Sequence, residues 1–128
     1  MNVDGGARGN PGPAAIAAVV TDPMGEILAE RSATIGDATN NVAEYRALLL
    51  GIELAKELDA DEAEFVGDSQ LIVEQVKGNW KVKQEHLRSL NAEAKRALVG
   101  LGNWSIRHVR RGENERADEL LNEALDAA

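Results

Sequence analysis

Four acidic residues stand at points where the sequence pattern changes from one predicted element to the next. Carboxylates that a fold draws together repel one another and raise each other's pKa, so divalent cations that neutralise them best explain such a cluster. Ligand sets made only of oxygen select hard ions such as Mg²⁺ or Mn²⁺. The sequence therefore predicts a metal site if the fold brings together Asp4, Glu44, Asp68 and Asp118.

Asp4 lies in a glycine-rich stretch, residues 2–13. Val3 is typical of a strand, so we expect Asp4 at the end of a short apolar strand. The glycines that follow permit backbone conformations, and a close approach of a ligand, that a Cβ would prevent. Taken alone, Asp-Gly-Gly is also typical of a turn. Partners elsewhere in the chain must decide between these interpretations.

Glu44 lies near the beginning of a predicted long and largely buried helix. We expect Asn41 to be the N-cap of this helix, which places Glu44 at its third position. Glu44 shares a helical stripe with Leu48, so its side chain is expected to point inward or to the edge of the buried face. The alternative is a capping-box glutamate, because Asn41-x-x-Glu44 fits that pattern.

The other two acids belong to the second half of the chain. Residues 62–67 alternate and become apolar, which predicts a strand ending at Asp68, where open α/β sheets place their ligands. Asp68 fits an N-cap equally well. Asp118 aligns with Leu121 and Leu125 on the apolar stripe of the last helix. A carboxylate there is unusual unless something binds it, and a water-exposed flank is the alternative.

Alternation and turn signals predict an antiparallel meander at the beginning of the chain. Only three residues precede Asp4, so the first strand is expected to be very short, as in a chain trimmed at this end. Beginning with this meander, the predicted order of elements along the chain is three strands, a helix, a strand, two helices, a strand and a helix. This order predicts an α/β fold. The expected later strands cover residues 14–21, 26–35, 62–67 and 104–109, with a turn at 22–25 and a helix over 82–99.

Composition fits one globular domain over residues 1–128, with 44% hydrophobic and 28% charged residues. No apolar run approaches the roughly 18 residues that a membrane span needs, and no signal pattern opens the chain. We therefore expect a cytoplasmic protein without membrane association. Since the sequence has no cysteine, disulfides and thiol chemistry are excluded.

The net charge of −8 argues against a polyanionic partner, but the charges are unevenly distributed. Residues 53–64 hold six acids and one lysine, whereas residues 107–111 hold no acid. A second basic segment is opposed only by Glu85 and consists of Lys77, Lys81, Lys83, His86 and Arg88. These segments either face a polyanion or form two solvated charged faces.

Four sequence blocks together resemble type 1 ribonuclease H. The match covers nearly the whole chain in the family's order, and its blocks are Asp4-Gly-Gly-Ala-x-Gly-Asn-Pro-Gly-Pro, Thr39-Asn-Asn-x-x-Glu-Tyr, Gly67-Asp-Ser-Gln-Leu and Arg111-x-x-Asn-x-x-Ala-Asp118. The resemblance implies the RNase H fold. This is an α/β fold whose five-stranded mixed sheet joins a three-strand antiparallel meander to two parallel strands, with helices on both faces. It also implies endonucleolytic hydrolysis of the RNA strand of an RNA/DNA hybrid.

The resemblance assigns the four acids to two Mg²⁺ ions, for which Mn²⁺ is expected to substitute. Asp4 would bridge both ions, Glu44 and Asp68 would complete one, and Asp118 would hold the other. Two ions roughly 3.5–4 Å apart can activate a water, orient a phosphate and stabilise the leaving oxygen. No nucleophilic side chain is then required.

Substrate choice must detect the 2′-hydroxyl, and amide side chains can both donate to it and accept from it. This chemistry favours Asn10, Asn41 and Gln70. The resemblance adds Thr39 near a DNA-strand phosphate, Trp80 near the DNA sugars, and four further contacts: Gly5, Gly6, Asn40 and Ser69, with Lys81 beside Trp80. Helix caps at Asn40 and Asn41, and a core position for Trp80, are the alternatives.

The chain departs from the family pattern in two places. The segment after Trp80 is too short for the basic handle of some members, and the loop at residues 110–113 lacks the histidine that many members carry. His108 lies upstream in a predicted strand, where a solvent-facing or packing role is expected. We expect a monomer with no obligate protein partner. Alternatives are a nuclease of the same fold that cuts duplex RNA or DNA junctions, and a non-catalytic hybrid-binding module.

Overall fold

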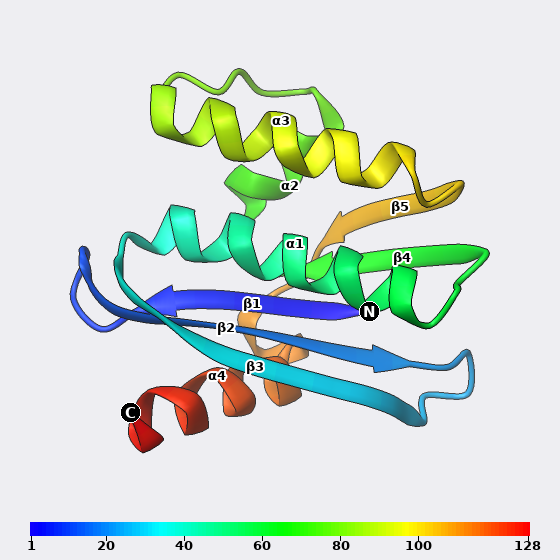
Figure 1. Ribbon diagram of the computed structural model, residues 1–128, viewed down its shortest axis with the longest axis horizontal. Coiled ribbons are helices and arrows are strands. Elements are labelled where there is room, and N and C mark those ends of the chain that lie inside the picture. Colours follow the sequence, from blue (N-terminus) through cyan, green and yellow to red (C-terminus); the bar gives the residue numbers. More distant parts are fainter.

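A five-stranded sheet with helices on both faces forms the protein, and the computed structural model describes residues 1–128 (Figure 1). The strand order is β3-β2-β1-β4-β5, with α1, α2 and α3 above the sheet and α4 below it in Figure 1. The strands are β1 (Asn2–Ala7), β2 (Gly12–Thr21), β3 (Ile27–Ala38), β4 (Glu62–Gly67) and β5 (Asn103–His108). The helices are α1 (Asn40–Glu57), α2 (Gln70–Lys77), α3 (Glu85–Val99), the short 3₁₀ helix η1 (Arg111–Glu113) and α4 (Glu115–Ala127).

The sheet is mixed, as the resemblance to the ribonuclease H family implied. Strands β1, β2 and β3 form an antiparallel meander, and β4 and β5 continue it in parallel from β1. Because β1 lies in the middle, its side chains contact helices on either face of the sheet. No helix is long and apolar enough to cross a membrane.

The first strand is longer than expected, and the prediction that Asp4 ends it was wrong. Asp4 is the third residue of β1 and pairs with Ala17, and the strand continues through Gly5 and Gly6 to Ala7, which pairs with Ala14. Glycine usually weakens a strand. Here pairing with β2 keeps the backbone extended, since both Gly5 and Gly6 have a partner residue in that strand.

Helix α1 crosses β1 at two glycines. A Cβ at Gly51 would lie 2.7 Å from Cγ1 of Val3, and a Cβ at Gly5 would overlap the carbonyl of Ala43. Both clashes are below the distance that real Cβ atoms show. The helix backbone therefore packs directly against β1 on the side of Gly5 where a Cβ would point.

Two of the expected helix caps were wrong. Thr39, not Asn41, caps α1, and its hydroxyl accepts from the Val42 amide at 3.2 Å. Ser69, not Asp68, caps α2. Glu44 is therefore not a capping-box glutamate, and Asp68 is not an N-cap.

The helix expected over residues 82–99 begins only at Glu85, with Gln84 at its N-cap position. The carbonyls of Lys81, Val82 and Lys83 accept instead from side chains. The predicted last strand begins one residue early, at Asn103, and β3 runs on to Ala38.

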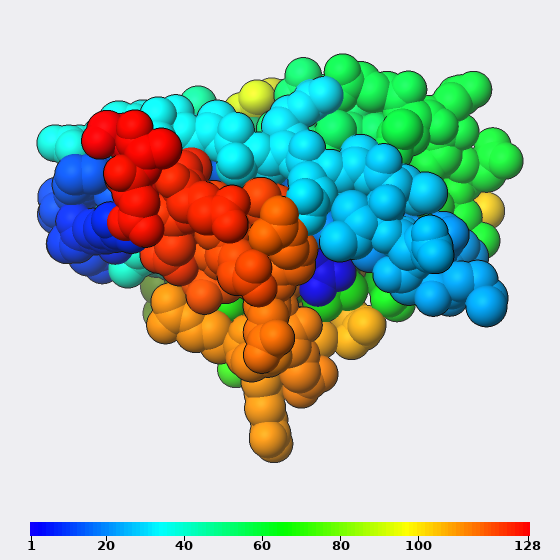
Figure 2. Space-filling model, turned by 90° about the horizontal axis from the view of Figure 1, so that it is seen from below, coloured from blue at the N-terminus to red at the C-terminus, as the bar shows by residue number.

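The core is divided by the sheet. On one face Tyr45 of α1 and Phe65 of β4 centre a cluster that α2 and α3 complete. On the other face α4 packs on the alanines of β2. Figure 2 shows α4, in orange to red, against β3, in light blue, and there Arg116 donates to Glu30 at 3.0 Å.

Replacing Gly5 by alanine should lower the free energy of unfolding by about 1–3 kcal/mol, the usual cost of overpacking, because α1 must move off β1. Gly6→Ala is the matched control, since its Cβ would meet only ordinary contacts at 3.8 Å. Urea unfolding of both variants measures the difference. Equal stability of the two variants would contradict the close contact at Gly5.

Candidate active site

Three of the predicted acids meet beside the middle of the sheet. The carboxylate oxygens of Asp4, Glu44 and Asp68 lie within 4.8 Å of one another. Asp4 comes from β1, Glu44 from the second turn of α1, and Asp68 directly follows β4. Two of these acids are buried, since only 5% of Asp4 and 8% of Glu44 is exposed. The expectation that Glu44 points inward is confirmed.

Burial and mutual repulsion make these acids hard to ionise. Burial first, and then the charge of Asp68, raise the pKa of Asp4 to about 7. Burial and the charge of Asp4 raise the pKa of Glu44 well above its usual value, although its Oε1 accepts from the Gly5 amide at 3.1 Å. Burial also raises the pKa of Asp68, an effect that the nearby Arg111 guanidinium opposes.

Asp118, on the first turn of α4, faces the same acids from the opposite side. Its charge contributes to the raised pKa of Asp4 and of Asp68, although it lies outside the group of three. Its Oδ1 is buried without a hydrogen-bond partner, and the closest cationic group is Nη2 of Arg111, at 3.9 Å. An unpaired buried carboxylate oxygen beside three acids of raised pKa fits the all-oxygen coordination of a hard divalent cation.

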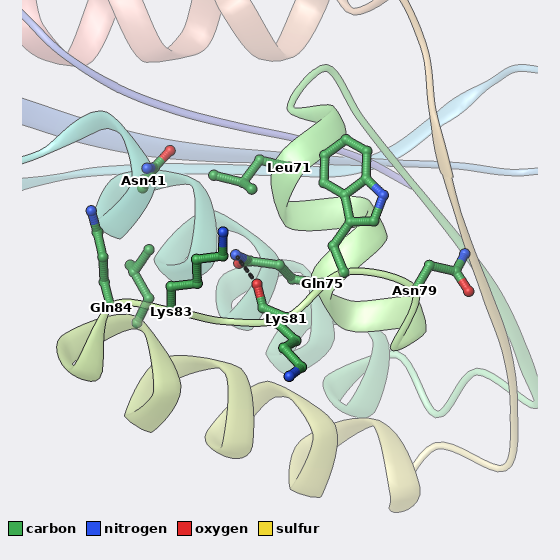
Figure 3. Close-up of a pocket in the computed structure, with 9 residues that line it drawn as sticks. Asn41, Leu71, Gln75, Asn79, Lys81, Lys83 and Gln84 are labelled. Atoms are coloured by element: carbon green, nitrogen blue, oxygen red, sulfur yellow. Dashed lines mark hydrogen bonds between the residues drawn. The ribbon is translucent and has the colours of Figure 1, made fainter.

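The acids open into a cleft of about 510 Å³, which a second groove of about 550 Å³ adjoins. Asn41 lines both cavities, and Figure 3 shows it among the residues of the second groove. Of the predicted substrate contacts, five line the acidic cleft, namely Gly5, Gly6, Asn40, Asn41 and Ser69. Trp80 and Lys81 line the second groove. The core position considered for Trp80 was wrong, because 45% of this residue is exposed.

The remaining predicted contacts, Asn10, Thr39 and Gln70, do not line the acidic cleft, and two of them hold the backbone beside it. Asn10 accepts from the Asn40 amide at 3.0 Å, and the Asn40 side chain accepts from the Ala7 amide at 2.8 Å. These bonds join the glycine-rich loop to the start of α1. Thr39 caps that helix, and Gln70 is the exposed first residue of α2. The capping alternatives for Asn40 and Asn41 were therefore wrong.

His108 is exposed at the end of β5, where it pairs with Gly67. Its charge is the smallest of the effects that act on the pKa of Asp68. The solvent-facing position expected for this histidine is what the structure shows.

Asn114 is a residue whose importance sequence reasoning missed. It is 1% exposed, donates to the Val3 carbonyl at 2.9 Å and accepts from the Asn2 side chain at 2.9 Å. Its own carbonyl accepts from the Asp118 amide at 3.1 Å. Asn114 thus ties the start of α4, and with it Asp118, to the strand that carries Asp4. Its place four residues before Asp118 was the available signal.

Comparison with known proteins identifies the family. The family described as "Reverse transcriptase-like" matches residues 2–124. The chain is 50% identical to ribonuclease HI of Halobacterium salinarum over 125 residues. The aligned region covers 98% of this chain and 63% of that protein. It is 34% identical to ribonuclease H of Hydrogenovibrio crunogenus, covering 96% of this chain and 92% of that protein.

The chain belongs to the ribonuclease H family. The resemblance found in the sequence is thereby confirmed. The chain spans only 35% of a third relative, a bifunctional protein of Mycobacterium tuberculosis that is 46% identical to it.

Solved structures of ribonuclease H proteins superpose closely on this one. RNase H1 from Halobacterium salinarum matches with a TM-score of 0.96 and 49% identity, covering 99% of this chain and 96% of that chain. LC11-RNase H1 in complex with an RNA/DNA hybrid matches with a TM-score of 0.94 and 45% identity. This match covers 98% of this chain and 95% of that chain. The expected RNase H fold is confirmed.

The raised pKa of Asp4 makes the metal-free protein sensitive to pH. A carboxyl with a folded pKa of about 7, against 3.8 as its ordinary value, stabilises the fold fully below pH 3.8 and loses this contribution as the pH rises to about 7. Asp4→Asn should therefore raise the melting temperature at pH 8 without metal and have little effect at pH 4. Mg²⁺ should raise the melting temperature of the wild type at pH 8.

Scanning calorimetry at both pH values measures these shifts. Glu93→Gln, at an exposed position of α3, is the control for loss of one negative charge. An Asp4→Asn variant that melts like Glu93→Gln at pH 8 would show that the acids do not repel.

Proposed function

We propose that this protein is a divalent-metal-dependent endoribonuclease that hydrolyses the RNA strand of RNA/DNA hybrids. The observation that carries the proposal is the group of three acids within 4.8 Å, two of them almost buried, at the centre of a ribonuclease H fold. Such a group is costly to ionise unless a cation binds it. The hybrid bound to LC11-RNase H1 supports the choice of substrate.

The proposed ligands are Asp4, Glu44, Asp68 and Asp118, for two Mg²⁺ ions that Mn²⁺ can replace. When bound, such ions activate water for attack on phosphorus and stabilise the negative charge of the leaving oxygen. The protein supplies the geometry. The Gly5 amide orients Glu44, and Asn114 holds the helix that carries Asp118. Since protons compete with metal for these carboxylates, activity should rise with pH towards neutrality.

The cleft offers side-chain amides and backbone groups, which can donate to and accept from a 2′-hydroxyl and suit recognition by sugar and shape. Asn41 is proposed to contact 2′-hydroxyls, because it stands where the acidic cleft meets the second groove. Asn10, Asn40, Gln70 and Ser69, with the backbone of Gly5 and Gly6, are proposed to line the minor groove. On the DNA strand, Thr39 and Lys81 would contact phosphates and Trp80 would pack on deoxyribose.

Replacing Asp68 by asparagine should lower kcat on a hybrid more than about 100-fold, because even changes outside the ligand shell of a metal cost 10–100-fold. The amide keeps the shape of the side chain and removes a repelling charge, so hybrid affinity without metal should stay equal or tighten. Turnover is measured with and without Mg²⁺ and binding by fluorescence anisotropy. Asp37→Asn, an exposed position of β3, is the control. Wild-type turnover in the Asp68 variant would refute the metal site.

Recognition of the 2′-hydroxyl predicts a dependence on the sugars beside the cleaved bond. A hybrid with deoxynucleotides flanking the scissile phosphate should be cut at least about 10-fold more slowly, the loss expected for one or two hydrogen bonds. Asn41→Ala should lose hybrid cleavage and retain the rise in melting temperature on Mg²⁺ addition. Parallel assays on hybrid, duplex RNA, duplex DNA and a four-way junction separate the substrates. Equal cleavage of all-DNA duplex would contradict the assignment.

A further inference from the structure

The segment between α2 and α3, residues 78–84, carries the side chains of one wall of the second groove. It forms neither helix nor strand. Trp80, Lys81 and Lys83 of this segment all line the groove. A stretch without secondary structure can present three side chains to one groove only if something fixes its backbone.

Three consecutive carbonyls of this segment are held by side chains of the flanking helices. Nε of Arg88 donates to the Val82 carbonyl at 2.9 Å, and Nη2 of the same guanidinium donates to the Lys83 carbonyl at 3.4 Å. Nε2 of Gln75 donates to the Lys81 carbonyl at 3.4 Å, the bond drawn as a dashed line in Figure 3. The backbone of residues 81–83 is therefore anchored from two sides.

Gln75 is itself held in one orientation. It is 4% exposed, and its Oε1 accepts from the Tyr45 hydroxyl at 2.6 Å. Asn91 donates to that hydroxyl at 3.1 Å and to the Gln75 backbone carbonyl at 3.3 Å. With its amide oxygen committed to Tyr45, Gln75 must turn its amide nitrogen towards Lys81. A buried network across α1, α2 and α3 thus sets the direction of this donor.

Arg88 is exposed, yet its donors point back at the protein. It belongs to the basic segment that was expected to face either a polyanion or solvent. No carboxylate lies within ion-pair distance of it, and its guanidinium forks over two backbone carbonyls. The planar fork of arginine suits this task, and the point charge of lysine does not.

We propose that Arg88, together with the buried Gln75, is a positioning residue for hybrid binding. The two side chains fix the backbone of residues 81–83, so that Trp80 and Lys81 are presented to the groove in one arrangement. Arg88 acts through the backbone and not through a phosphate. This inference rests on the proposed function, because it assigns the second groove to the hybrid.

The decisive variant is Arg88→Lys, which keeps the positive charge and removes the fork. Its KM for a hybrid should rise about three- to ten-fold, as expected for loss of one or two hydrogen bonds to the backbone, while kcat changes less than two-fold. The slope of log affinity against log salt should stay as in the wild type. Arg96→Lys, at an exposed position on the same helix with no hydrogen bond from its side chain, should change none of these values.

A spectroscopic measurement makes the test independent of catalysis. In a Trp104→Phe background, Trp80 is the single tryptophan, and its accessibility to acrylamide should increase in Arg88→Lys and in Gln75→Leu. Val76→Ala is the control for a general loss of stability in α2, because it removes buried side-chain volume from the same helix and none of the hydrogen bonds to the segment. It should lower the melting temperature and leave Trp80 unchanged.

The outcomes separate the possible roles. A shallower salt slope in Arg88→Lys, with Trp80 unchanged, would mean that Arg88 contacts phosphate and would overturn the proposal. A lower melting temperature with KM and Trp80 unchanged would reduce both residues to a structural role and would also overturn it. If the wild type fails to cleave hybrids, the proposed function fails, whereas the response of Trp80 still decides whether Arg88 and Gln75 position the segment.

Discussion

The contact between α1 and β1 at Gly5 is the constraint on which the site depends. Because no side chain separates the helix from the strand there, Glu44 comes close enough to accept a hydrogen bond from the Gly5 amide. Its carboxylate also lies close to that of Asp4. A wider helix–sheet spacing, usual when larger side chains intervene, would carry Glu44 away from the other acids. The alanines of β2 extend the same principle to the opposite face, where they let α4 approach the sheet closely.

This close packing brings carboxylates together that repel one another when no metal is bound. Asp4 and Glu44 are buried without a paired cation, and their raised pKa values express that cost. Two groups limit the cost at the edge of the site. Burial raises the pKa of Asp68, and the charge of Arg111 and a side-chain hydrogen bond from the uncharged Asn114 oppose that rise. A bound cation would offset the remaining repulsion, and the unpaired oxygen of Asp118 could serve as a further ligand.

The second groove is organised differently, by neutral and backbone interactions instead of charge repulsion. The buried network of Tyr45, Gln75 and Asn91 links the helix that carries Glu44 to the segment that carries Trp80. Tyr45 directly follows Glu44 in α1, so adjacent residues of one helix turn line the acidic cleft and donate a hydrogen bond to Gln75, which lines the groove. The net charge of −8 is compatible with a polyanionic partner on such a surface, because the acids of the cleft are the proposed metal ligands and the lining of the groove includes two lysines and several amides.

The mixed sheet was predicted from the family resemblance. The sequence by itself determined the order of the elements and singled out the four acids, because alternation, helical periodicity and turn residues act over a few neighbours. It placed β4 at residues 62–67 without error, and the four sequence blocks were sufficient to indicate the family. The caps at Thr39 and Ser69 are local bonds to amides three residues further along, so the sequence held that signal among several neighbouring candidates. Tertiary structure decided that β1 runs through its glycines, because each of them pairs with β2, and it brought the acids together. The grouping of the acids depends on contacts such as Asn114 to Val3, 111 positions apart, and Gly5 to Glu44, 39 apart, which no local pattern encodes. For the same reason a lone arginine in a basic segment suggests a phosphate contact, and only the folded chain shows which carbonyls lie within its reach.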